Sequence, residues 1–246
     1  MSNNKLQDTL RIASTFLIEE EGGANYKTDE GWKVYEDPVV KKNKGETLPT
    51  VGPGLTGKSV VELAKMKVGE VIPHEKVQSL FEDTLKTINT NLGEEFKGTY
   101  SSLASNEQAA LISLIYNVGL TNFKTGGKEE GTSKAYRALK EGKYDAFKKE
   151  TFDANVGFVR SGGVIIKGLQ NRRRHELNLF NKGLQEKNSG GIKQNPIANI
   201  TSPLENLAKV NEKKIARAKM YRDKNWAKDD TIDDLVWDKM MNKSKA

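Results

Sequence analysis

The chain has 246 residues, of which 36% are hydrophobic and 30% are charged, and its formal net charge is +7. This is the composition of a water-soluble globular protein with one sizeable domain, or with one domain and an appendage. The absence of cysteine excludes disulfides, thiolate metal sites and thiol nucleophiles, and two histidines are too few for a His-rich metal site. The basic balance favours a polyanionic partner such as an acidic cell wall, an anionic lipid or a nucleic acid.

The first predicted element is an amphipathic helix that ends at the sequence EEEGG. Its apolar residues fall on one helical face, and they are Leu6, Leu10, Ala13 and Leu17. Charged side chains at Lys5, Asp8 and Arg11 interrupt the apolar pattern, which distinguishes this segment from a signal peptide. No segment of the sequence is long and apolar enough to span a bilayer, so we expect no integral membrane segment.

Residues 24–57 predict a small irregular sheet. They are polar and rich in turn-forming residues, with short β-like pieces such as WKVYED. Glycine and proline dominate the stretch LPTVGPGLTG at residues 48–57. These residue types predict a tight turn that exposes its backbone.

The chain from residue 74 to residue 183 is predicted to be mainly helical. One apolar stripe at helical spacing is formed by Val77, Leu80, Phe81, Leu85, Ile88 and Leu92. The segment SNEQAALISLIYNVG is apolar nearly all round, which predicts a buried central helix, with Ser105 and Gln108 as a capping box. Further helices are expected over 132–140, 144–151 and 168–183.

The composition changes at KNSGGIKQNPIANITSP, where glycines and prolines predict a linker over residues 187–202. Beyond it, two amphipathic helices are expected within a basic helical C-terminal extension over residues 203–246. The predicted fold is therefore α+β. It consists of a mainly helical domain over residues 1–186, with a small β region near the N-terminus, followed by the extension.

Three residues near the predicted turn suggest the hydrolysis of a glycosidic bond. Glu21 ends the first helix, Asp37 lies in VYEDP, and Thr50 opens the glycine-rich turn. One carboxyl group must stay protonated to protonate the leaving oxygen, and the other must stay ionised to orient water or stabilise positive charge. A threonine hydroxyl can hold that water. Taken singly, three glutamates in a row are more typical of a solvated surface, and Asp-Pro of an ordinary turn.

Three regions of the chain, taken together, resemble a known family: an N-terminal region with three short motifs, a central helix and a closing segment. The segments EEEGG, VYEDP and TVGPGLT are similar to the E-G…Y-x-D-P…T-x-G-x-G-H-T signature of phage-type lysozymes, glycoside hydrolase family 24. SNEQAALISLIYNVGLTNF resembles the central helix of that family, and VRSGGVIIKGLQNRRRHELNLF resembles its closing segment, GG-x-x-x-x-GL-x-x-RR-x-x-E-x-x-LF. The resemblance covers residues 5–183 and implies a lysozyme-like fold.

The resemblance also assigns roles to the residues of this chain. Glu21 matches the family's general acid, Asp37 the second carboxylate, and Thr50 the threonine that orients water. Gly52 and Gly54 would let the backbone approach the substrate. Neither a cofactor nor a metal ion is implied.

Four further residues are candidates for the site, Arg172 and Arg173 as supporting residues and Asn117 and Trp32 as substrate-binding residues. Arg172 and Arg173 resemble the family's arginine pair, which packs near the acid. Asn117 resembles the asparagine of the central helix, and we expect it near the substrate site, where it joins helix to sheet by hydrogen bonds. Trp32 is a candidate platform for sugar stacking beside the cleft, although packing inside the domain is the favoured role.

The sequence also departs from the family pattern. The separations from Glu21 to Asp37 and from Asp37 to Thr50 are both longer than is typical, which predicts insertions in the β region. YKTDEGW is a competing match, with Tyr26 as the signature tyrosine and Asp29 as the carboxylate. Leu55 stands where the family usually has histidine. EEEGG also resembles the acid motif of a second phage muramidase family, although the central and closing segments fit family 24 better.

The resemblance predicts a muramidase that cleaves the β-1,4 bond between N-acetylmuramic acid and N-acetylglucosamine in bacterial peptidoglycan. Such an enzyme would be made in the host cytoplasm without a signal peptide. It would reach the cell wall as an endolysin released by a holin, or as a lysin carried by the virion. The C-terminal extension is a candidate contact for a virion or tail protein. The alternative function is a non-catalytic virion or wall-binding protein on a lysozyme scaffold. Binding of nucleic acid is disfavoured, because the sequence lacks aromatic residues interleaved along a basic groove.

Overall fold

The computed structural model describes residues 3–21, 26–36, 48–56, 65–127, 131–161 and 163–188. The helices are α1 (Asn3–Glu21), α3 (His74–Ser102), α4 (Ser105–Val118), α5 (Leu120–Thr125), α6 (Lys134–Lys140), α7 (Tyr144–Phe152) and α8 (Lys167–Asn188). The strands are β1 (Gly31–Lys33), β2 (Tyr35–Glu36), β3 (Pro49–Val51), β4 (Leu55–Thr56), β5 (Val71–Pro73), β6 (Arg160–Ser161) and β7 (Val164–Ile165). The mainly helical α+β fold predicted from the sequence is confirmed.

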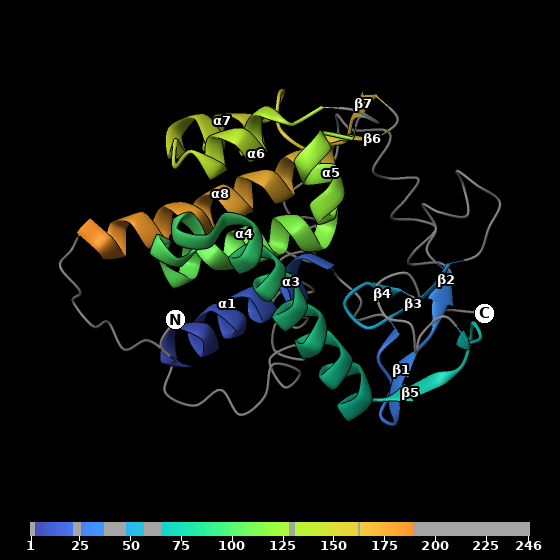
Figure 1. The fold of residues 1–246 in the computed structure, drawn as a ribbon. Coiled ribbons are helices and arrows are strands. Elements are labelled where there is room, and N and C mark those ends of the chain that lie inside the picture. Colours follow the sequence, from blue (N-terminus) through green and yellow to red (C-terminus); the bar gives the residue numbers. More distant parts are fainter. Residues whose placement is uncertain are drawn as a thin grey trace, which may run out of the picture. The chain divides into compact units, whose positions relative to one another are not determined.

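Helix α4 is the centre of the helical part, and it packs against both α1 and α8 (Figure 1). Every residue from Glu107 to Ile115 is buried, as expected for a helix that is apolar nearly all round. The predicted capping box is wrong in its residues. The carboxylate of Glu107 accepts a hydrogen bond from the backbone N–H of Ala104 at 2.5 Å, whereas Gln108 is buried and donates to the carbonyl of Tyr100 at 2.8 Å.

The apolar stripe of α3 faces the core almost as predicted. Its buried members are Val77, Leu80, Phe81, Leu85 and Leu92, while Ile88 is only half-buried. The neighbouring residue Asn89 is buried instead, because its side-chain oxygen accepts a hydrogen bond from the hydroxyl of Tyr100 at 2.8 Å. The helix is interrupted near its C-terminal end by Lys97, whose backbone is not helical.

A second group of buried residues joins α5, α7 and α8. It is built from aromatic rings that meet edge to face or tilted, namely Phe123, Phe147, Phe152 and Phe180. Such ring pairs add about 0.5–1.5 kcal/mol each beyond the area that they bury. This cluster holds the helices that follow α4 against α8.

Within the described ranges, the strands form three small antiparallel sheets. One has the order β2-β3-β4, one pairs β1 with β5, and the third pairs β6 with β7. Figure 1 shows β1 to β5 gathered on one side of the helices. The sequence predicted this region, but it did not predict the β6–β7 pair, whose strands have only two residues each.

The predicted linker and C-terminal extension lie outside the described residues, apart from the two residues at the end of α8. The predicted domain boundaries therefore stay predictions. Within the described part of the chain, no helix is both long enough and apolar enough to cross a membrane.

Candidate active site

Glu21 is the last residue of α1, and its carboxylate contacts Arg172, which follows it by 151 residues in the sequence. Arg172, on α8, donates from Nη1 to Glu21 Oε1 at 2.5 Å. The side chain of Glu21 keeps 20% of its surface exposed, whereas that of Arg172 keeps 8%. The predicted acid is therefore held from the protein side by a buried cation while part of it stays open to solvent.

The glycine-rich turn lies on another side of the same carboxylate. A Cβ atom added at Gly54 would lie 3.1 Å from Glu21 Oε2. Gly54 has a φ of +83°, a left-handed conformation that favours glycine. The turn is held from α4 by Tyr116, whose hydroxyl donates to the carbonyl of Pro53 at 2.7 Å. The absence of a side chain at Gly54 thus makes room for the predicted acid.

Gly52 serves a different purpose. Its φ is +59°, and a Cβ atom there would lie 2.6 Å from Cγ1 of Val77 on α3. Glycine at this position therefore allows the turn to pack against α3. Leu55, at the position where the family usually has histidine, is fully buried and contributes to the core.

Thr50 lies in β3 directly before this turn. Strand pairing sets Thr50 opposite Tyr35 of β2 and opposite Thr56 of β4. Its side chain is almost completely buried, and its hydroxyl donates to the carbonyl of Leu48 at 3.1 Å. A threonine hydroxyl keeps acceptor capacity after donating one hydrogen bond, so this geometry is compatible with holding a water molecule.

The second carboxylate has two candidates, of which Asp37 lies outside the described residues. Asp29 is exposed in a turn that is closed by the hydrogen bond from Thr28 N to Gly31 O at 2.8 Å. That turn leads into β1, which pairs with β5 rather than with the strand of Thr50. The residue before Asp37, Glu36, belongs to β2 and pairs with Pro49, next to Thr50.

Arg172 belongs to a buried cluster of charges, which we call the arginine–glutamate cluster and which comprises Glu21, Arg172, Arg173 and Glu176. Glu176 is fully buried, and its Oε1 lies 3.3 Å from Arg172 Nε and 3.0 Å from Arg173 Nη2. Arg173 Nε lies 2.8 Å from Glu176 Oε2. The hydroxyl of Ser113 on α4 also donates to Glu176 Oε1, at 2.7 Å.

The pKa shifts in this cluster reflect burial opposed by neighbouring charge. Burial lowers the pKa of Arg172, but the carboxylates of Glu21 and Glu176 more than offset this, so that the pKa is raised overall. Burial raises the pKa of Glu176, against the opposing effect of Arg173 and Arg172. All of the polar partners of Glu176 named above are donors, which is the environment of an ionised carboxylate.

Asn117 is exposed at the end of α4 and is linked to this cluster. Its side-chain oxygen accepts a hydrogen bond from Arg173 Nη2 at 2.9 Å. We predicted that Asn117 joins a helix to the sheet. This hydrogen bond instead joins two helices, because Arg173 belongs to α8. Asn117 therefore joins α4 to α8 at the solvent edge of the arginine–glutamate cluster.

Trp32 does not offer a stacking platform for sugar, and the structure gives it the packing role that the sequence favoured. The residue is fully buried, so neither ring face is available to a ligand. Its ring packs edge-on to His74 and lies beneath the turn, where a Cβ atom on Gly52 would approach within 4.0 Å. Trp32 therefore supports the turn from inside the domain.

An aromatic pair near the turn was missed in the sequence analysis. The rings of Tyr26 and Tyr35 stack with centroids 3.9 Å apart, and Tyr26 is 38% exposed. Tyr35 is also close enough to Tyr116 to contribute, after burial and the charge of Glu21, to the raised pKa of the Tyr116 phenol. A signal was present, because Tyr26 and Tyr35 are the tyrosines of the two competing matches YKTD and YED.

Other missed residues are Tyr116, Ser113 and Glu176. Tyr116 and Ser113 lie in the central segment, and Glu176 is the glutamate that follows the arginine pair in the closing segment. Helical periodicity groups them with the core, and it carries no information about which buried polar group meets which. One more pair flanks the site, since His175 Nδ1 lies 2.8 Å from Glu20 Oε1.

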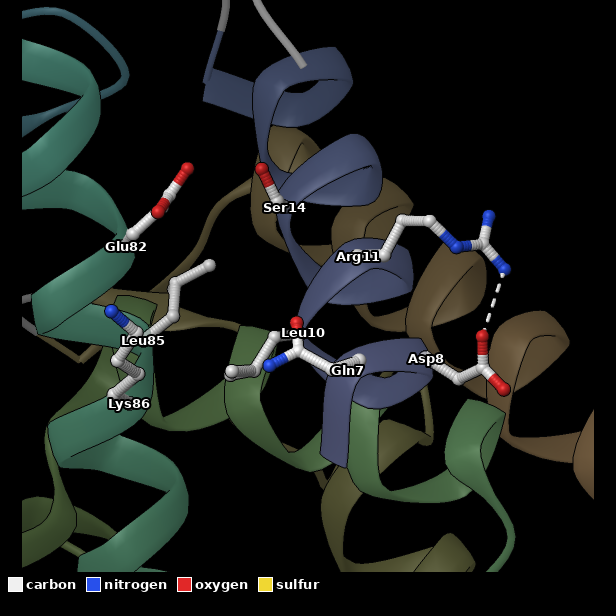
Figure 2. Close-up of a pocket in the computed structure, with 8 residues that line it drawn as sticks. All are labelled: Gln7, Asp8, Leu10, Arg11, Ser14, Glu82, Leu85 and Lys86. Atoms are coloured by element: carbon white, nitrogen blue, oxygen red, sulfur yellow. Dashed lines mark ion pairs between the residues drawn. The ribbon is translucent and has the colours of Figure 1, made fainter. Parts of the chain in front are cut away.

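A separate pocket of about 340 Å³ lies between α1 and α3 (Figure 2). Its walls include Leu10 and Ser14 of α1 and Leu85 of α3, together with the ion pair of Arg11 with Asp8 at 3.5 Å. None of the predicted site residues lines it.

Among the residues that the structure describes, no group of three or more His, Cys, Asp or Glu side chains is arranged to hold a metal ion.

Comparisons with known proteins find similarity to phage endolysins. The endolysin of Bacillus phage PZA is 28% identical over 147 residues, which are 58% of this chain and 51% of that protein. The chain therefore spans about half the length of that curated relative. Among solved structures, the active form of the P1 phage endolysin Lyz has a TM-score of 0.52 at 19% identity, with 70% of this chain and 84% of that chain covered.

A further solved structure is the endolysin of the Escherichia coli O157:H7 phage FAHEc1, with 21% identity, a TM-score of 0.44, and coverage of 70% of this chain and 90% of that chain. The likeness to P1 Lyz shows the fold alone.

The sequence model of the phage lysozyme family matches residues 27–176, which is more than half of the chain. That range contains the turn and ends at Glu176, although Glu21 precedes it. The chain belongs to the phage lysozyme family.

Proposed function

We propose that this protein is a peptidoglycan-cleaving glycoside hydrolase. The specific reaction that we assign to it is that of a muramidase, which cleaves the β-1,4 bond between N-acetylmuramic acid and N-acetylglucosamine. Family membership supports the general class of reaction. The observation that carries the assignment is the position of Glu21, which is partly exposed between the guanidinium group of Arg172 and the turn at Gly54.

Glu21 is the general acid in this proposal. A protonated carboxyl group transfers its proton to the glycosidic oxygen as the bond to the anomeric carbon breaks, and that carbon becomes positively charged. The leaving oxygen must come within hydrogen-bond reach of Glu21, and the 20% of the side chain that is exposed provides this access. Arg172 holds one carboxylate oxygen, Oε1, and leaves Oε2 beside Gly54, which has no side chain.

Asp37 and Thr50 together activate the water molecule that attacks the anomeric carbon from the opposite face. Asp37 is preferred over Asp29 because the residue before it, Glu36, pairs with Pro49 beside Thr50. Asp29 is instead exposed in the turn before β1. Inversion at the anomeric carbon follows from this arrangement, since water rather than the carboxylate is the nucleophile.

Substrate contacts in the proposal come from the turn and from the stacked tyrosines. The exposed ring of Tyr26 is rigid because it lies against Tyr35, and a rigid aromatic face can cover the apolar face of a sugar. The net charge of +7 favours approach to an anionic cell wall. Delivery as an endolysin or as a virion-carried lysin, and a virion partner for residues 203–246, remain proposals that rest on the sequence.

The test is the release of new reducing ends from purified peptidoglycan by the wild type and by Glu21→Gln. We expect activity in the wild type and a loss of at least about a hundredfold in the variant, which is what the loss of a general acid costs. Asp37→Asn and Asp29→Asn in parallel decide the second carboxylate, and we expect only the first to abolish activity. An inactive wild type, on a substrate that a known muramidase cleaves, would leave the non-catalytic scaffold as the better explanation.

A further inference from the structure

Burying the carboxyl group of Glu176 carries a desolvation penalty, and Glu176 takes no direct part in the proposed reaction. It is fully buried in α8, where it faces Arg172, Arg173 and Ser113. A buried ion pair is often no more stable than apolar residues of similar volume would be. Stability alone therefore does not account for the burial of Glu176, and its contacts with Arg172 indicate a second role.

One guanidinium group connects Glu176 to the predicted acid. Arg172 donates from Nη1 to Glu21 Oε1 at 2.5 Å and from Nε to Glu176 Oε1 at 3.3 Å. Because a guanidinium group is planar and rigid, holding Nε fixes the direction in which Nη1 points. Ser113 holds Glu176 in turn, through its hydroxyl at 2.7 Å.

The same contacts balance charge around the predicted acid. The arginine–glutamate cluster has two cations, Arg172 and Arg173, and two carboxyl groups. Without Glu176, the positive charge of Arg172 would act on Glu21 without the counter-charge that lies beside Arg172 Nε, and a less balanced cation favours the ionised form of a neighbouring carboxyl group. Among the described residues, the other titratable groups facing the cluster are Glu20 with His175, and Tyr116.

We propose that Glu176 is a positioning residue for the hydrolysis reaction. It holds Arg172 in the orientation that supports Glu21, and it balances the guanidinium charge so that Glu21 can carry the proton that a general acid needs. The proposal rests on the general-acid role of Glu21 proposed above. Glu176 touches neither substrate nor reacting atoms and acts through Arg172.

The test is the pH dependence of kcat/KM for peptidoglycan hydrolysis by the wild type and by Glu176→Gln. The alkaline limb of such a profile reports loss of the proton from the essential acid of the free enzyme. We expect this limb to move to lower pH by about half a unit or more in Glu176→Gln, because a charge a few ångströms away has been removed. At a pH on the alkaline limb, such a shift corresponds to about a threefold lower rate.

Glu107→Gln is the matched control. Glu107 is also a fully buried glutamate, but it lies at the start of α4, where its carboxylate accepts from the backbone of Ala104. The control also replaces a fully buried carboxyl group by an amide, and we expect the alkaline limb to stay where it is in the wild type. A shift of equal size in both variants would overturn the proposal, since general loosening would then explain it.

Ser113→Ala covers the case in which Glu176→Gln does not fold. Removing this donor weakens the ionised form of Glu176 without changing the packing of a large side chain, and we expect a smaller shift of the alkaline limb in the same direction. An unmoved alkaline limb in whichever of the two variants is folded would overturn the positioning role.

The Glu21→Gln variant separates the two proposals. If it keeps its activity, the general-acid assignment fails. If Glu21→Gln is inactive and the alkaline limb of Glu176→Gln is unmoved, only the role of Glu176 is overturned.

Discussion

Arg172 and Glu21, which are 151 residues apart in the sequence, meet at 2.5 Å between Nη1 and Oε1. The contact joins the last residue of α1 to α8, and α4 packs against both of these helices. It ties the predicted acid to the buried pair of Arg172 and Glu176. The consequences concern stability as well as activity.

Replacing Arg172 by Met should destabilise the domain strongly. The variant leaves Glu176 fully buried with one guanidinium partner instead of two, and breaking a buried ion pair from one side costs about 3 kcal/mol. Urea unfolding followed by circular dichroism measures this loss. Arg174→Met is the control, because Arg174 is exposed on the same helix and bonds only weakly to Asn171 at 3.3 Å. Equal stability of the two variants would contradict the buried position of Arg172.

Replacing Gly54 by Ala should lower activity more than stability alone explains. The left-handed backbone costs a residue with a Cβ atom about 1–2 kcal/mol, and the new methyl group would press on the carboxylate of Glu21. Displacement of a catalytic group by a fraction of an ångström lowers the rate by about tenfold or more. Gly163→Ala controls for the backbone, since its φ is also +83° and its Cβ would meet open space. If both variants lose activity equally, contact with Glu21 is not the cause.

Removing the hydroxyl of Tyr116 should loosen the turn. Tyr116→Phe loses the hydrogen bond to the carbonyl of Pro53 and leaves that carbonyl without this donor, which costs about 1 kcal/mol. Burial, and then the charge of Glu21, hold the pKa of Tyr116 well above its ordinary value, so the phenol remains a donor over the working pH range. We expect a several-fold lower kcat in a peptidoglycan assay, with little change for Tyr144→Phe, whose hydroxyl lies at the surface beside Ser102.

Truncation of Tyr26 should weaken substrate binding. In Tyr26→Ala the stacked pair with Tyr35 loses its exposed ring, and the loss of one stacked aromatic contact is worth about 1 kcal/mol. We expect KM for soluble glycan fragments to rise about fivefold, which is that energy expressed as a ratio. Tyr26→Phe keeps the ring and should keep KM. An unchanged KM in Tyr26→Ala would remove the tyrosine pair from the proposed substrate surface.

Glu95 should contribute a pH-dependent part of the stability. Hydrogen bonds from Lys124 and Tyr136 lower its pKa in the folded protein below the ordinary value of 4.5. Because the folded state favours the ionised form, this stabilisation is present above pH 4.5 and is lost as the pH falls through the lower folded-state pKa.

We therefore expect Glu95→Gln to unfold more easily than the wild type at pH 7, by up to about 1 kcal/mol for a partly exposed pair. The difference should narrow as the pH falls below 4.5. Denaturant titrations at a series of pH values measure it. Asp83→Asn serves as the control, since Asp83 pairs with Lys86 at the surface with 64% of its side chain exposed. A difference that persists unchanged at low pH would contradict the lowered pKa.

Local patterns in the sequence were sufficient for most of the helices. The period of the apolar residues predicted α1, α3 and α4, because a helix must turn one face to the core, and α4 is buried along most of its length as its composition indicated. The same reasoning could not find the capping residue at Ala104, because alanine has no side-chain acceptor. It also missed the β6–β7 pair, whose two-residue strands are too short to show a period.

The candidate site was predictable in part. The order of the motifs led to Glu21, Thr50, Arg172 and the glycine turn, and the structure brings Glu21, Arg172 and Gly54 together. The role of Glu21 stays a prediction until the variant is assayed, as does that of Asp37, outside the described residues. For Trp32 both stacking and packing stayed open, because the local pattern around a tryptophan near a turn does not depend on whether its ring faces solvent or the core; the ring is buried.

The sequence by itself determined the class of the fold and the family, because these depend on apolar periodicity and on short motifs that are local in the chain. Only the tertiary structure decided which charges meet. Glu176 shares one guanidinium group with Glu21 because α4 brings α1 and α8 together, and no local pattern records a contact between residues so far apart. Buried polar groups must find partners wherever the fold provides them, and in this protein that requirement connects the predicted acid to the core.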